Sequence, residues 1–360
     1  MLLLKQNCVE VFIGNSMTTA STKRIGFCCK WIDSPDQTEG IKSTDDARKY
    51  NTGTTTVAWL NRQTRDVAEQ KLWDLMVANI ESTRKLVERV STLDASLRMV
   101  RLSSDLLPCY THESFASYWL QPDVVSYAET AFARVGDLAR NTGVRLSFHP
   151  GQFTVLASSN PGIVNRSIEE FEYHANMAKW MGYGKQFQDF KINVHISGQG
   201  GPAGIRSAYS RLSPEARNCI TIENEENSWG LNDCLELGDI LPIVLDIHHH
   251  WIREGEYIDP ADPRVLRVIE SWRGVRPALH YSVSREDVLV GHDTEVLPNY
   301  KQLLSEGYKK QKMRAHSDFY WNKPANEWAL SFWDNFDIQC ESKGKNLASF
   351  RLYEQAKAMI

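Results

Sequence analysis

The sequence Leu241-Pro-Ile-Val-Leu-Asp246-Ile-His-His-His250 joins an apolar run to a carboxylate and three imidazoles. Its β-branched segment, residues 243–247, is typical of a parallel strand that is covered on both faces. Parallel α/β folds place their chemistry at the carboxyl ends of such strands. A single histidine more often forms a hydrogen bond in a core than binds an ion. Four ligand-type residues within five positions instead favour a metal site at this strand end.

The direction of each side chain after Asp246 stays open at this stage. A continuing strand would point Asp246, His248 and His250 to one face and His249 to the other. The chain leaves the sheet near this point, so the alternation need not hold. Each of the three histidines is therefore a candidate ligand, or a partner that orients a ligand through its other ring nitrogen.

The length and composition of the chain limit which classes of protein it can belong to. With 360 residues, 42% hydrophobic and 24% charged, the chain resembles an ordinary soluble globular protein. Its formal net charge of −4 gives no overall basic field, so a nucleic-acid partner would need a local basic surface or bound cations. Seven scattered cysteines without a CxxC pair fit a reducing cytoplasm. No stretch is long enough to span a bilayer, and residues 1–22 are expected to be a disordered extension.

Short apolar strands alternate with amphipathic helices from residue 23 onward. Strands are expected at 24–31, 97–104, 144–149, 191–197, 219–226, 243–247, 276–284 and 336–341. Helices are expected at 63–90, 124–142, 167–181 and 262–272. Eight strands separated by helices, with no break in composition, predict one (β/α)8 TIM-barrel domain over residues 23–360. The glycine-rich run 198–204 is expected to be a flexible loop, and it lacks the spacing of a nucleotide-binding motif.

Ligand-type residues stand at the ends of several of these strands. They are His149, His195, Glu223, Asp246, His280 and Glu341. In a barrel these ends converge on one mouth, so residues far apart in sequence become neighbours. Nitrogen and carboxylate-oxygen ligands without cysteine suit zinc, manganese or iron, and their number exceeds what one ion requires. The sequence therefore predicts two or three ions at the C-terminal mouth, an arrangement that can hydrolyse phosphodiesters.

Eight short motifs lie at these strand ends and in the loops that follow them. They are Arg101-Leu-Ser-Ser-Asp-Leu, His149-Pro-Gly-Gln152-Phe153, Asn193-Val-His195, Ile222-Glu223-Asn224, Asp246-Ile-His-His249, Leu279-His280-Tyr-Ser, Ala315-His316-Ser-Asp318 and Glu341-Ser-Lys343-Gly-Lys345. With these motifs the chain resembles the UV damage endonucleases of the UvdE type, relatives of the endonuclease IV and xylose isomerase-like barrels. The resemblance runs from about Arg24 to Leu352. Any one motif alone would be weak, but the set is specific.

The resemblance implies a metal-dependent DNA repair endonuclease. Such an enzyme cuts immediately 5′ to a UV photoproduct or another lesion and leaves a 3′-hydroxyl and a 5′-phosphate. Two or three divalent ions are implied, manganese first, with zinc or magnesium as alternatives. The implied ligands are His112, His149, His195, Glu223, Asp246, His249, His280, His316 and Glu341. The implied catalytic residues among them are Glu223, Asp246, His280 and Glu341.

The resemblance also implies residues that contact DNA. Gln152 and Phe153 would push into the duplex where a lesion is flipped out, and Phe27 would add a second ring. An amide can bond to bases across the gap, and an apolar wedge can replace lost stacking. The implied phosphate contacts are Lys343, Lys345, Lys310 and Arg314.

Two other functions stay open. A sugar isomerase or epimerase on the same barrel would use two ions and a base, but it has no use for the wedge at Gln152 and Phe153. A catalytically impaired DNA-damage-binding protein is the second, because Ala278 stands where related enzymes can carry a modified lysine that contacts the metals. The expected partner is damaged double-stranded DNA, without a membrane or a nucleotide cofactor. A cytoplasmic, nucleoid-associated monomer of bacterial, archaeal or viral origin is expected.

Overall fold

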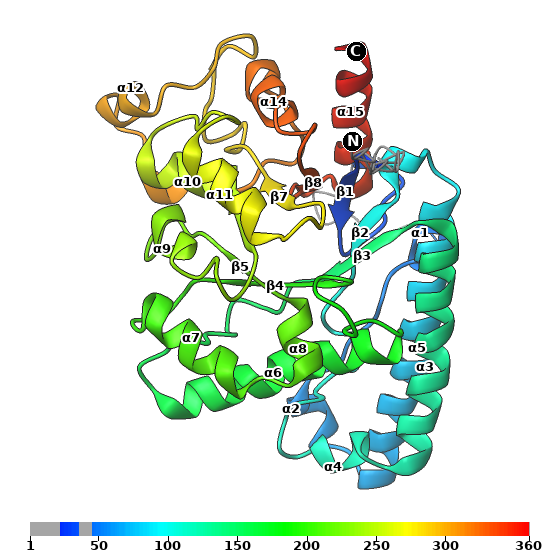
Figure 1. Cartoon of the computed structure of the whole chain (residues 1–360). Helices are drawn as coiled ribbons and strands as arrows, with labels where there is room; N and C mark the ends of the chain where they lie inside the picture. The colour runs from blue at the N-terminus through cyan, green and yellow to red at the C-terminus, as the bar shows by residue number, and fades with distance from the viewer. Residues whose placement is uncertain (1–21, 36–44, 360) are drawn as a thin grey trace, which may run out of the picture.

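A closed barrel of eight parallel strands forms the centre of the computed structural model, which describes residues 22–35 and 45–359. Each strand pairs with the next along the chain, and the last pairs with the first (Figure 1). The strands are β1 Ile25–Cys28, β2 Met99–Arg101, β3 Arg145–Phe148, β4 Lys191–His195, β5 Ile220–Glu223, β6 Ile243–Asp246, β7 Ala278–Tyr281 and β8 Asp337–Cys340. The predicted (β/α)8 barrel is therefore confirmed. Residues 1–21 of the predicted extension lie outside the described residues.

Helices connect the strands and cover the outside of the barrel. The longer ones are α3 Arg65–Ser91, α5 Pro122–Thr142, α6 Pro161–Trp180, α7 Gly201–Arg211, α10 Ile247–Glu254, α11 Pro263–Ser271, α14 Lys323–Leu330 and α15 Lys345–Ala358. The shorter ones are α1 Asp45–Arg48, α2 Val57–Leu60, η2 Ala95–Leu97, α4 Ala116–Trp119, α8 Pro214–Cys219, α9 Leu231–Leu235, α12 Tyr300–Ser305 and α13 Lys310–Met313. Among the described residues, no helix is both long and apolar enough to cross a membrane.

Helix boundaries follow capping signals in the sequence. Thr64 caps α3 by accepting a hydrogen bond from the backbone N–H of Val67. Helix α5 begins at Pro122, whose fixed φ suits a first turn, and ends at Gly143, whose φ of 69° is left-handed. The helices expected at 63–90 and 124–142 are therefore correct to within a few residues.

Two local expectations were wrong. The run 198–204 is not a loop throughout, because α7 begins at Gly201 and takes Pro202 into its first turn. The strand expected over 243–247 ends at Asp246, and α10 begins at once with Ile247. The side-chain alternation of a strand therefore does not apply to the three histidines, which point in directions about 100° apart around a helix.

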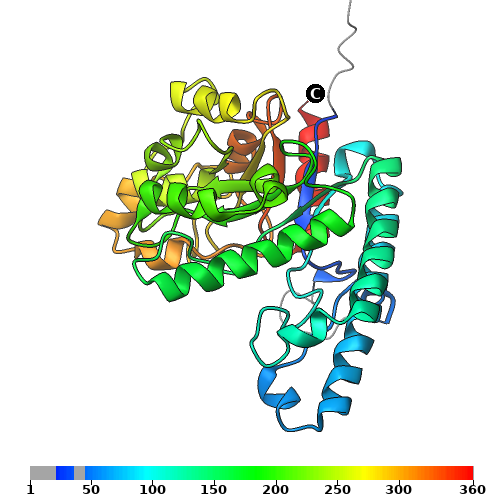
Figure 2. The ribbon, with the colours of Figure 1, turned by 60° about the horizontal axis from the view of Figure 1, so that its bottom comes forward.

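The first turns of α3 lie beyond the body of the barrel. Figures 1 and 2 show α3 and α5 side by side along one flank, with α2 and α4 beside the far end of this pair. Since α3 ends just before β2, its start lies toward the carboxyl ends of the strands. The α2–α5 region therefore forms a projection on the same side of the molecule as the barrel mouth.

Asp337 anchors the opposite end of the barrel. Its side chain is fully buried at the start of β8 and contacts three arginines. Arg145 Nη1 lies 2.7 Å, Arg276 Nε 2.7 Å and Arg24 Nη1 3.6 Å from its oxygens. A buried carboxylate that loses such partners is strongly destabilising. The cluster joins segments beside β1, β3, β7 and β8, and so it helps to close the barrel.

Candidate metal centre

Glu223 lies at the centre of a set of carboxylates and imidazoles inside the barrel mouth. Its side chain is fully buried. It belongs to three groups whose potential ligand atoms lie within 4.8 Å of one another. The groups are His149, Glu223 and His280; His195, Glu223 and His249; and Glu223, Asp246, His280 and Glu341. Every predicted ligand except His112 and His316 is therefore in at least one group.

The register of the barrel explains why these residues meet. His195 is paired with Glu223 across β4 and β5, and Asp246 is paired with His280 across β6 and β7. Paired residues on neighbouring strands lie about 5 Å apart and point to the same face. Two adjacent pairs of ligand-type residues thus come from strand pairing alone.

The start of α10 selects His249 from the three consecutive histidines. Asp246 caps this helix by accepting a hydrogen bond from the backbone N–H of His249 at 2.7 Å. The Nδ1 atom of His249 lies 3.0 Å from the carbonyl oxygen of Asn224, which leaves Nε2 turned toward the mouth. His250 instead bonds to a glutamate outside the centre, and His248 stacks on a tryptophan ring. Only His249 joins the groups around Glu223.

Several buried ligand atoms in the centre lack a hydrogen-bond partner among the described residues. They are Oε1 of Glu223, Oδ2 of Asp246, Nδ1 of His280 and Nδ1 of His195, although the first and third of these lie 3.1 Å apart. Buried polar atoms rarely stay unpaired in native proteins, and a bound ion can satisfy several of them at once. Imidazole nitrogen and carboxylate oxygen are ligands that zinc, manganese and iron accept. The donor set therefore fits divalent metal ions.

The charges in the centre are strongly coupled. Burial alone would raise the pKa of Glu223, but the imidazoles around it hold that pKa well below its usual range. Burial raises the pKa of Asp246 well above its usual range, and Glu223 and Glu341 raise it further. Burial opposes a charge on His249, but the nearby carboxylates, Asp246 first, raise its pKa to about 9. Ion binding must therefore displace protons from this centre.

Two basic side chains lie against the ligands, and neither was predicted to have a role. Arg101 bonds to Glu341. Lys191 is buried in the barrel, and its Nζ lies 2.9 Å from Nε2 of His280; burial lowers the pKa of this lysine to about 7. Alternation along β4 places Lys191 on the same face as His195, and this signal could have identified it. Ala278 is buried in an apolar cluster and offers no ligand.

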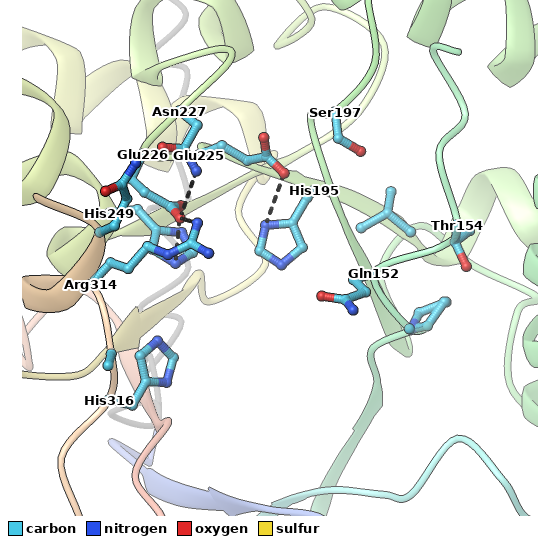
Figure 3. A pocket seen from close by; sticks show the side chains of 15 residues that line it. Gln152, Thr154, His195, Ser197, Glu225, Glu226, Asn227, His249, Arg314 and His316 are labelled. Carbon is cyan, nitrogen blue, oxygen red and sulfur yellow. Dashed lines mark hydrogen bonds and ion pairs between the residues drawn. The ribbon is translucent and has the colours of Figure 1, made fainter.

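A cavity of about 540 Å³ opens above the centre (Figure 3). Its lining includes Gln152, Thr154, His195, Glu225, Glu226, His249, Arg314 and His316. The two carboxylates that follow Asn224 were not among the predicted site residues. Oε1 of Glu225 lies 3.8 Å from Nδ1 of His195, and Oε2 of Glu226 lies 3.7 Å from Nε2 of His249. Each of these carboxylates therefore stands beside a ligand histidine.

The two remaining predicted ligands have different positions. His316 lines the cavity, and its ring centroid lies 6.4 Å from that of His249. His112 belongs to none of the three groups. Its Nδ1 accepts a hydrogen bond from the backbone N–H of Ser114 at 3.2 Å, and its ring lies beside Phe115. The turn that follows β2 therefore holds His112 by local contacts.

The predicted lesion-probing residues also differ from one another. Gln152 and Phe153 follow β3; Gln152 lines the cavity, and the Phe153 side chain is 84% exposed. Phe27 is only 1% exposed, and its ring packs edge-on against Trp31 at 5.9 Å. Phe27 therefore belongs to the hydrophobic core and does not offer a ring to DNA in this conformation.

The predicted phosphate contacts lie on two segments near the mouth. Lys310 Nζ bonds to the carbonyl oxygen of Glu226 at 2.6 Å, and Arg314 Nη1 bonds to Oε1 of the same residue at 2.9 Å. Lys343 follows β8 and pairs with an aspartate at 3.4 Å, and Lys345 begins α15. Lys310 and Arg314 are thus tied to the centre by protein contacts.

The fold and the site together define a TIM-barrel protein with a histidine–carboxylate centre suited to divalent ions. The sequence matches the UV-endonuclease UvdE family over residues 40–359, so the chain belongs to this family. The resemblance seen in its motifs is thereby confirmed.

Relatives with known names agree with this assignment. A UV-damage endonuclease of Neurospora crassa is 33% identical over 204 residues, which cover 52% of this chain and 30% of that protein. A UV DNA damage endonuclease of Bacillus cereus is 25% identical over 312 residues, which cover 83% of this chain and 86% of that protein. The crystal structure of SacUVDE shares the fold, with a TM-score of 0.68 at 21% identity over 94% of this chain and 99% of that one.

Proposed function

We propose that this protein is a metal-dependent DNA repair endonuclease. It hydrolyses the phosphodiester bond immediately 5′ to a UV photoproduct or related lesion and leaves a 3′-hydroxyl and a 5′-phosphate. Membership of the UvdE family supports the proposal. One observation supports it most strongly. A centre with unpaired ligand atoms lies below a cavity that Gln152 and Thr154 line, and the exposed Phe153 stands between these two residues in the chain.

Divalent ions held at this centre would promote ionisation of water and neutralise charge on a phosphodiester. The chain supplies the scaffold for this chemistry. Glu223 is shared by all three groups and receives a hydrogen bond from Asn193. Arg101 holds Glu341. Lys191, as the neutral amine, would accept a hydrogen bond from Nε2 of His280 and so leave the lone pair on Nδ1, which faces Glu223 at 3.1 Å. These contacts keep the ligands in place before substrate binds.

The same arrangement would compensate for the net negative charge of the protein when it binds DNA. Bound ions place positive potential at the mouth, and Lys343 and Lys345 add local charge for the DNA backbone. Gln152 and Phe153 enter the duplex at the flipped lesion, where the amide bonds to bases and the ring replaces lost stacking. We further propose that the enzyme acts as a cytoplasmic monomer that uses two or three ions, with manganese first among them.

A nicking assay on ultraviolet-irradiated and untreated plasmid with Mn²⁺ tests this function. We expect nicks that depend on irradiation and disappear with a chelator. Glu223→Gln should abolish them while the far-ultraviolet circular dichroism stays unchanged, because each group loses a charged ligand. Cleavage retained by this variant would refute the assigned centre. Binding of irradiated DNA without nicks would indicate a damage-binding protein, and no response to irradiation would leave the sugar isomerase as the better proposal.

A further inference from the structure

Glu226 lies beside the metal centre but outside the three groups, and its two carboxylate oxygens have different surroundings. Oε1 accepts hydrogen bonds from Nη1 of Arg314 at 2.9 Å and from Nδ2 of Asn227 at 3.0 Å. Oε2 faces Nε2 of His249 at 3.7 Å (Figure 3). The side chain is only 12% exposed. One oxygen is therefore held by donors, and the other is turned toward the ions' position.

The hydrogen bond at Nδ1 of His249 determines whether Nε2 carries a hydrogen or a lone pair in the neutral ring. Its Nδ1 lies 3.0 Å from the carbonyl oxygen of Asn224, and a carbonyl oxygen can only accept. Nδ1 is therefore the donor, and in the neutral ring Nε2 carries a lone pair. A lone pair on nitrogen and a carboxylate oxygen then face each other across 3.7 Å. Two acceptors in this arrangement need a cation between them, which is either a proton on Nε2 or a metal ion.

The gap has the dimensions of two ligands on one ion. Bonds of about 2.0–2.2 Å from an imidazole nitrogen and a carboxylate oxygen to a common ion span it at an open angle. His249 already belongs to the group formed with His195 and Glu223, and its Nδ1 lies 3.6 Å from Oε1 of Glu223, so an ion at Nε2 would lie beside the centre. Ligating carboxylates are usually fixed by a hydrogen bond to their second oxygen. Arg314 makes that bond here.

We propose that Glu226 is a further ligand of the ion that His249 binds, that Oε2 is its donor atom, and that Arg314 fixes the carboxylate through Oε1. The inference rests on the proposed function only in assuming that this centre binds divalent ions. Arg314 belongs to the segment that begins with α13, and Lys310 of that helix bonds to the backbone of Glu226. The ligand is thus coupled to a distant segment of the chain that covers one side of the cavity.

The alternative is a proton in the gap, with Glu226 acting only as a counter-ion of a charged His249. The two alternatives differ in how many contacts the ion loses when the carboxylate is removed. The chain also offers a matched control. Glu256 lies between His250, at 2.9 Å, and Arg264, at 2.7 Å, in the same combination of carboxylate, α10 histidine and arginine but outside the three groups.

Equilibrium dialysis of the full chain against Mn²⁺, with metal content measured by mass spectrometry, tests the proposal. We expect Glu226→Gln to weaken one Mn²⁺ site by more than about 100-fold, which exceeds the roughly 10- to 100-fold that partners outside the ligand shell cost. Arg314→Met should stay within that smaller range, and Glu256→Gln should bind as the unaltered protein does. The visible spectrum of the Co²⁺-loaded Glu226→Gln variant should also change, while its circular dichroism does not.

Wild-type Mn²⁺ affinity and an unchanged Co²⁺ spectrum in Glu226→Gln would overturn the proposal. Equal losses in Glu226→Gln and Arg314→Met would also overturn it, because Glu226 would then act only by anchoring the arginine. If the unaltered protein binds no Mn²⁺, the proposed function fails together with this inference. Normal binding by the unaltered protein with normal binding by Glu226→Gln refutes the ligand alone.

Discussion

Phe153→Ala is expected to remove much of the preference for damaged DNA without destabilising the fold. The side chain is 84% exposed, so little of its apolar surface is buried when the protein folds. Substitutions at such positions usually change the free energy of unfolding by no more than about 0.5 kcal/mol. Stability and DNA recognition can therefore be separated at this residue.

The size of the effect on DNA follows from the same exposure. Nearly the whole ring is available to contact bases, and stacking between an aromatic side chain and a base contributes about 1–3 kcal/mol. This range corresponds to a loss of about 5- to 150-fold in affinity for a duplex that contains a lesion. Intact duplex offers no gap for the ring, so its affinity should change little.

Fluorescence anisotropy with otherwise identical duplexes, one carrying a single photoproduct, measures both affinities when a chelator prevents cleavage. Leu120→Ala is the matched control, because Leu120 is 70% exposed but its chain neighbours do not line the cavity, whereas Gln152 and Thr154 on either side of Phe153 do. The control should retain the preference of the unaltered protein. If Phe153→Ala also retains it within about twofold, the ring does not probe the lesion and the proposed recognition is wrong.

Three further predictions concern ions, stability and phosphate contacts. Mn²⁺ affinity should rise with pH until about 9 and then level off. The surrounding carboxylates raise the pKa of His249 to about 9, and below this pH an ion must displace a proton from the ring. Calorimetry that shows a constant affinity over this range would contradict the prediction. Asp337→Asn should lower the free energy of unfolding in urea by about 3–5 kcal/mol, since three arginines lose their buried partner, and an unchanged midpoint would refute this. Lys345→Met should reduce the slope of log affinity for DNA against log salt by about 1, and an equal slope would exclude a phosphate contact.

Much of the fold and of the metal centre could be predicted from the sequence because both depend on strand register. Parallel strands in a barrel end at one mouth, so a carboxylate or imidazole at the end of each strand is placed by the fold itself. His195, Glu223, Asp246 and His280 were predicted for this reason, and they form two cross-strand pairs. The prediction of the metal centre therefore depended on one pattern, a ligand-type residue at the end of an apolar strand, that recurs along the chain.

Residues outside this pattern could not be placed in the same way. The position of Glu226 depends on Arg314, which lies 88 residues further along the chain. His112 follows β2 in a turn, and local hydrogen bonds there orient its ring. The periodicity of hydrophobic residues does not predict the conformation of such a turn. Phe27 was expected to face DNA, but a four-residue strand gives little information on which face is turned inward. Asp246 likewise caps a helix, so the residues after it do not point to alternate faces as they would in a strand.

The pairing of β1 with β8 has a consequence for how the protein is made. Ile25 pairs with Ile338, so barrel closure joins segments separated by most of the chain. Contacts between such distant segments form late, because a long loop must be closed first. Glu341 follows β8 and completes the group around Asp246 and His280. A chain still emerging from the ribosome therefore lacks one carboxylate of this group until its last strand has been made.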